Sequence, residues 1–180
     1  MSNTEKMIDL LRAIKVDTNG AVVGAMQERG LSYAMSYGVA LPTIRVCAKV
    51  YYPDTDFAKF LYLQQVRELR LSALYIADPK QVTLENGDFW LSGMETSEIA
   101  DVVAMKLFSS SDDAWEFAYK YLESENVMAC YSSLMTGLRL IDESSLDYLN
   151  HLNVVKHTDA IIRIALEKIE SKFDMLSFGC

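Results

Sequence analysis

Apolar residues recur along nearly the whole chain at intervals of three and four positions, which is the spacing of amphipathic helices. The alternation of apolar and polar residues that marks a half-buried strand does not persist over any useful length. The three prolines stand where a helix begins or has just ended. We therefore predict an all-α protein, with helices at about 4–15, 21–29, 32–37, 42–51, 56–64, 67–77, 83–94, 96–108, 111–122, 126–138, 142–150 and 159–172.

The helix predicted over residues 96–108 has a clear start and one unusual charge. Thr96 or Ser97 can cap its first free N–H groups, and Glu98 lies in the first turn, where the helix dipole favours a carboxylate. Asp101 then interrupts the apolar side of the helix one turn from its N-terminus. A carboxylate in this position needs either a structural partner or a chemical role.

The predicted helices come in pairs joined by short turns. The pairs begin near residues 4, 32, 56, 83, 111 and 143, at a spacing of roughly thirty residues. Helix pairs at such a spacing are typical of a degenerate helical repeat. We therefore predict a HEAT/ARM-like solenoid, an α-α superhelix, in which residues 1–180 form a single domain; a compact helix bundle is the alternative.

Composition narrows the class of protein. The chain is 51% apolar and 23% charged, as expected of a soluble globular protein, and no apolar run approaches the ~18 residues that span a bilayer. The cysteines are odd in number and without a close pair, which indicates a reducing compartment, so a cytoplasmic protein is expected. The two histidines are loosely spaced and no Gly-rich phosphate loop occurs, so we expect neither a metal site nor a cofactor.

The net charge of −8 bears on nucleic-acid binding. Proteins that grip phosphates usually carry a basic excess or a basic stripe, whereas this chain has 17 Lys and Arg against 25 Asp and Glu. A local basic face would have to come from a sparse set of positions on the predicted helices, namely Arg67, Arg70, Arg139, Arg163 and Lys168. The same residues are equally typical of solvated helix faces.

Two stretches resemble a known family. Residues 37–45, YGVALPTIR, are similar to the aromatic-Gly-Ile/Val…Pro…Arg signature near the N-terminus of the bacterial DNA alkylation repair proteins, the HEAT-like repeat DNA glycosylases and their relatives. Residues 67–79, RELRLSALYIADP, resemble the second repeat of that family, where an Arg-Glu pair opens a helix. The resemblance implies a solenoid that recognises double-stranded DNA carrying alkylated bases.

The resemblance extends only in part to the functional positions of the family. Active members have a Trp-Asp-x-Val-Asp stretch at the start of a middle helix; here Ser97 replaces the tryptophan, Glu98 the first acid, and Asp101 keeps the second. A later helix starts at Asn126 as in the family but lacks both expected arginines, and Ile164 stands where a tryptophan precedes Ala-Leu. The resemblance therefore implies one retained carboxylate and the loss of aromatic and arginine side chains that would hold DNA beside it.

The resemblance implies that Asp101 is the catalytic residue, because a carboxylate can stabilise the positive charge that builds on the sugar as a base leaves. It further implies that Arg67, Arg70 and Arg45 contact DNA and that Trp90 supplies an aromatic face.

Each assignment has a structural alternative. Asp101 could be a partly buried acid paired with Arg67 or Arg70, and Trp90 could be a core residue. The alternative function is a non-catalytic HEAT-repeat scaffold that has lost the glycosylase site and binds a protein partner.

Overall fold

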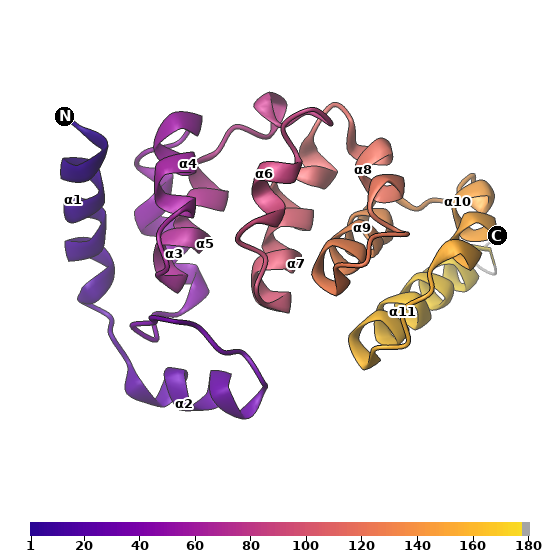
Figure 1. Ribbon diagram of the computed structural model, residues 1–180, viewed down its shortest axis with the longest axis horizontal. Helices are drawn as coiled ribbons and strands as arrows, with labels where there is room; N and C mark the ends of the chain where they lie inside the picture. Colours follow the sequence, from indigo (N-terminus) through magenta and orange to yellow (C-terminus); the bar gives the residue numbers. More distant parts are fainter. Residues whose placement is uncertain (178–180) are drawn as a thin grey trace. The chain divides into compact units, whose positions relative to one another are not determined.

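The computed structural model describes residues 1–177, and within this range it contains helices and turns but no strand (Figure 1). In the described part of the chain, three short 3-10 helices accompany the α-helices: Pro79–Gln81, Phe108–Ser110 and Leu152–Val154. The α-helices are α1 (Asn3–Lys15), α2 (Gly20–Glu28), α3 (Leu41–Lys49), α4 (Thr55–Tyr62), α5 (Arg67–Ile76), α6 (Asp88–Leu91), α7 (Ser97–Lys106), α8 (Ala114–Lys120), α9 (Val127–Leu140), α10 (Leu146–His151) and α11 (Ala160–Ser177).

The chain divides into two compact units, Met1–Gln81 and Val82–Cys180. In the first unit, α5 is the central helix and packs against both α3 and α4, while α1 packs against α3 and α4. Nearly every residue of α5 is buried, including its charged first turn. The core of this unit is therefore built around a helix whose two faces are both covered.

In the second unit, α7, α9 and α11 pack side by side in that order, and α8 covers another face of α9 (Figure 1). The middle helix α9 is buried at every position from Ala129 to Gly137. Gly137 allows the close approach of α10, since a Cβ atom at this position would collide with the buried ring of Tyr148. Helix α9 is thus the central helix of this unit, and α7, α8 and α11 pack around it.

Two of the predicted helix starts are confirmed by their caps. The Thr96 hydroxyl accepts a hydrogen bond from the Ile99 N–H at 3.4 Å, and the Asn126 side chain accepts from the N–H groups of Met128 and Ala129. The helix expected to open at Asp56 instead begins at Thr55.

The helix predicted over residues 32–37 is wrong. This segment is irregular and lies between Gly30 and Gly38, which both have positive φ, of 74° and 70°. Its backbone is held from outside: the Tyr37 N–H donates to the Glu68 carboxylate at 3.1 Å, and the Met35 carbonyl accepts from the Arg67 N–H at 2.9 Å. Tertiary hydrogen bonds to α5 replace the intrahelical ones that the local pattern favoured.

Of the helix predicted over residues 83–94, only the short helix α6 forms. Asn86 caps a turn instead, because its side chain accepts a hydrogen bond from the Thr83 N–H at 3.0 Å. Asn86-Gly87 therefore forms a loop, and Trp90 lies within the short helix that follows.

Candidate nucleic-acid interface

Asp101 lies on α7 and is partly buried against α9. The Tyr131 hydroxyl donates a hydrogen bond to its Oδ2 atom at 3.2 Å. Its Oδ1 atom is buried and has no hydrogen-bond partner among the described residues. One carboxylate oxygen thus accepts a hydrogen bond from a tyrosine, while the other is buried with an unused capacity to accept one.

Two cations act on this carboxylate from neighbouring helices. Burial raises the pKa of Asp101 above its usual value, and the Tyr131 hydrogen bond, the Arg139 charge and the Lys168 charge offset part of that rise. Burial and the negative charge of Asp101 likewise raise the pKa of Tyr131, which keeps the phenol protonated as a donor. The site is therefore an acid held by one hydroxyl and flanked by positive charge.

The three adjacent helices α7, α9 and α11 bring these residues together. Asp101, Arg139 and Lys168 are each visible as candidates in the sequence, but Tyr131 is not, because this tyrosine falls in the apolar stripe of α9 and looks like an ordinary core residue. Arg139 comes from the last turn of α9, where its guanidinium also donates to the Met135 carbonyl at 2.6 Å. The expected family arginines near the start of this helix are absent from the sequence, but the charge of Arg139, in the last turn of the helix, acts on Asp101.

Arg67 and Arg70, predicted as phosphate contacts, lie in the interior of the first unit and are only 3% and 7% exposed. The Arg67 guanidinium donates to the Val39 carbonyl at 2.9 Å and to the Glu68 carboxylate at 3.1 Å. The Arg70 Nε atom donates to the Gln64 carbonyl at 2.9 Å. Both guanidinium groups therefore serve to position neighbouring backbone segments, and their role in DNA contact stays a prediction.

Trp90, the predicted aromatic contact, is fully buried in the second unit and makes an edge-on contact with Phe89 at a centroid distance of 5.1 Å. An indole that is enclosed in this way stabilises the fold mainly through its packing contacts. Its predicted DNA-binding role would require it to become exposed, and that role stays a prediction as well.

Arg45 is the exposed member of the predicted DNA-binding set. It lies on α3 one turn before Lys49, which is also exposed, and α3 contains no acidic residue. The Thr43 hydroxyl of this helix donates a hydrogen bond to the Asp17 carboxylate at 3.1 Å. Arg45 and Lys49, which we call the α3 basic pair, thus form a small cationic surface.

The charge of the chain is divided unequally between the two units. Residues 1–81 contain ten Lys and Arg against eight Asp and Glu, whereas residues 82–180 contain seven against seventeen. The first unit is therefore weakly basic and the second strongly acidic. A polyanion is attracted to the first unit and repelled by most of the second.

The described residues hold no cluster of His, Cys, Asp and Glu that could bind a metal ion. Within the same part of the chain, no helix is both long enough and apolar enough to cross a membrane. Cys47 and Cys130 are free thiols, and Cys180 lies outside the described residues.

No protein-family model and no curated protein sequence matches the chain. A solved structure does match, with a TM-score of 0.81 over 95% of this chain and 77% of the other. The chain has the HEAT-like repeat fold. The matching protein is described as representing a new family related to the HEAT-like repeat DNA glycosylases, with affinity for branched DNA structures.

The sequence-based prediction of an all-α HEAT-like repeat is confirmed by this match. At 18% identity, the likeness establishes the HEAT-like repeat fold and leaves the function open. Whether the two units act as the single domain expected from the sequence stays a prediction.

Proposed function

We propose that this chain is a DNA-binding protein that recognises branched DNA and does not excise bases. The observation that carries the proposal is the similarity of fold, over 95% of the chain, to a protein with affinity for branched DNA. The resemblance of residues 37–45 and 67–79 to the DNA alkylation repair family points independently to DNA as the ligand.

The α3 basic pair is our candidate for phosphate contact. Phosphate contacts dominate protein–DNA affinity, and a lysine and an arginine on successive turns of one exposed helix face can reach neighbouring phosphates. The helix lies in the unit with the basic balance of charge, whereas the acidic excess belongs to residues 82–180. Recognition of branched DNA is compatible with so small a basic surface, because the shape of the DNA then contributes to specificity.

Replacing both members of the α3 basic pair, Arg45→Glu with Lys49→Glu, is expected to weaken binding to a four-way DNA junction by about tenfold or more. The physical reason is the loss of two phosphate contacts and the introduction of two repulsive charges. Fluorescence anisotropy with a labelled junction, repeated over a range of salt concentrations, measures this effect. The variant should also show a shallower dependence of affinity on salt, by about one to two units of slope.

The matched control is Arg12→Glu with Arg29→Glu, which reverses two exposed arginines, one on α1 and one directly after α2, and makes the same change in net charge. This control should retain affinity within about threefold of the wild type. A linear duplex of the same base composition should bind more weakly than the junction. Equal binding of junction and duplex, or no binding of either, would contradict the proposal.

Base excision is the second candidate function, and the buried Oδ1 atom of Asp101, which has no hydrogen-bond partner among the described residues, favours it. An ionised carboxylate flanked by Arg139 and Lys168 is chemically able to stabilise a cationic sugar. Against it, the Tyr131 hydrogen bond occupies the other oxygen, and burial raises the pKa of Asp101, which disfavours the ionised form.

We expect no release of N-methylated purines from a DNA duplex above the uncatalysed background, for the wild type and for Asp101→Asn alike. The measurement is the amount of free base, separated by chromatography at high protein concentration. Release by the wild type that Asp101→Asn abolishes would replace our proposal with the glycosylase assignment. Release that persists in Asp101→Asn would indicate a contaminating activity. The proposal of branched-DNA recognition would then depend on the junction-binding measurements alone.

A further inference from the structure

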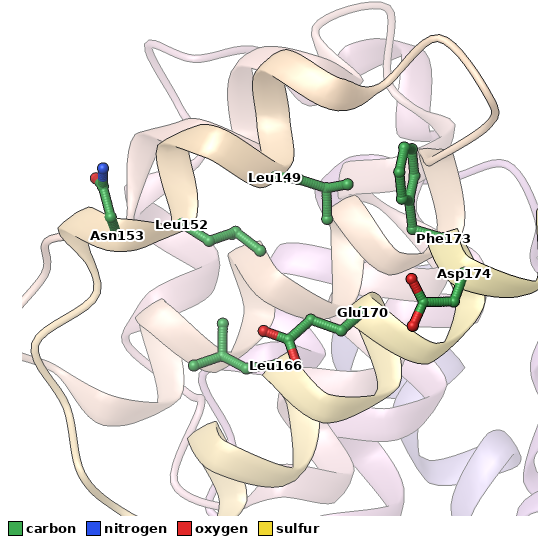
Figure 2. A pocket seen from close by; sticks show the side chains of 7 residues that line it. All are labelled: Leu149, Leu152, Asn153, Leu166, Glu170, Phe173 and Asp174. Atoms are coloured by element: carbon green, nitrogen blue, oxygen red, sulfur yellow. The ribbon is translucent and has the colours of Figure 1, made fainter. Parts of the chain in front are cut away.

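The acidic unit carries an apolar groove between α10, the 3-10 helix that follows it, and α11. Leu149 and Leu152 form one wall, and Leu166 and Phe173 of α11 form the other (Figure 2). The groove has a volume of about 370 Å³, within the range of about 300–1,000 Å³ found for ligand sites. It is an apolar space that the described residues leave partly open.

Two carboxylates lie along this groove. Glu170 and Asp174 stand four residues apart on α11, so they share one face of the helix and are both exposed. Figure 2 shows both side chains on the α11 side of the space between the helices. Neither is paired with a cation within the described range, and the nearby Lys172 instead donates to the Leu138 carbonyl at 2.8 Å.

We propose that this groove binds a basic amphipathic helix of a partner protein. Aliphatic side chains of such a helix would fill the space between Leu149, Leu152 and Leu166, while lysines or arginines one turn apart would meet Glu170 and Asp174. Charge complementarity selects this occupant, because the unit carries seventeen acidic residues against seven basic ones and repels nucleic acid and acidic peptides. The inference is independent of DNA binding at α3.

The probe is a fluorescent 14-residue peptide of leucine and lysine only, arranged as an amphipathic helix. Reversing both carboxylates, Glu170→Lys with Asp174→Lys, is expected to weaken its binding by at least about tenfold, because an exposed ion pair contributes up to about fivefold in affinity. Leu152→Ser should weaken binding about threefold or more by removing an apolar wall without changing the charge. Thermal unfolding of each variant shows that the fold is retained.

The matched control reverses two exposed acids outside the groove, Glu116→Lys with Glu143→Lys, and should change affinity less than about twofold. A serine–lysine peptide of equal charge should bind at least about tenfold more weakly than the probe. Equal losses in the groove and control variants, or equal binding of the two peptides, would overturn the proposal, since diffuse attraction to an acidic surface would then explain the binding.

Sedimentation velocity of the wild type completes the test. If the wild type is a monomer and binds the probe, the result supports a partner other than a second copy of this chain. A dimer that the Glu170→Lys, Asp174→Lys variant dissociates would overturn the proposal, because the occupant would then be a second copy of this chain.

Discussion

Replacing Glu68 with alanine is expected to lower the free energy of unfolding by about 3–5 kcal/mol. Glu68 is completely buried at the start of α5, where its carboxylate accepts hydrogen bonds from the Ser36 hydroxyl, from the N–H groups of Tyr37 and Val39, and from Arg67. Alanine would leave the Arg67 charge in the interior without this partner and two backbone N–H groups without an acceptor. These interactions form one network, so the stability lost on replacing Glu68 is larger than the contribution of any single hydrogen bond.

Urea unfolding followed by circular dichroism measures this change. Glu28→Ala, at the exposed end of α2, is the matched control and should cost less than about 0.5 kcal/mol. Glu68→Gln should fall between the two, since an amide keeps the shape and an acceptor oxygen but leaves the Arg67 charge unbalanced. A loss below about 1 kcal/mol for Glu68→Ala would show that the irregular segment 31–40 is held by other contacts.

Replacing Trp90 with alanine is expected to lower the free energy of unfolding by about 3–5 kcal/mol, because it empties the space of the largest fully buried side chain. Trp90→Phe should cost less, about 1–2 kcal/mol, since an aromatic ring still fills most of that space. The same denaturant titration measures both variants.

The phenylalanine variant also separates the two assignments made for Trp90. If its role is packing, Trp90→Phe should leave junction affinity within about twofold of the wild type. A matched change in the same unit is Trp115→Phe, at a less buried tryptophan that contacts Tyr119 and Tyr148. A fall of tenfold in DNA affinity for Trp90→Phe, without such a fall for Trp115→Phe, would show that the Trp90 indole reaches DNA after a change of conformation.

The residues of the candidate site at Asp101 could be predicted from the sequence only in part. A carboxylate on the apolar side of a helix is visible in the sequence, and so is the cap at Thr96 that fixes the start of α7. Its partner Tyr131 lies thirty residues away and falls in an apolar stripe, so only the packing of α9 against α7 shows that the phenol faces the acid. Arg45 was predictable as an exposed cation, whereas Arg67 and Arg70 are buried in positions where they donate to the carbonyls of Val39 and Gln64.

The sequence by itself determined the helical class and most helix positions, because the spacing of apolar residues and the capping residues are local properties of the chain. The roughly thirty-residue spacing of helix pairs favoured a HEAT-like repeat but left a compact helix bundle open, and the similarity of fold to a HEAT-like repeat protein decided between them. Only the tertiary structure decided that residues 32–37 are not helical, that Asp101 accepts a hydrogen bond from Tyr131, and that the charges of Arg139 and Lys168 act on Asp101. The physical reason is that hydrogen bonds and charges from distant segments outweigh local propensity wherever a polar group is buried.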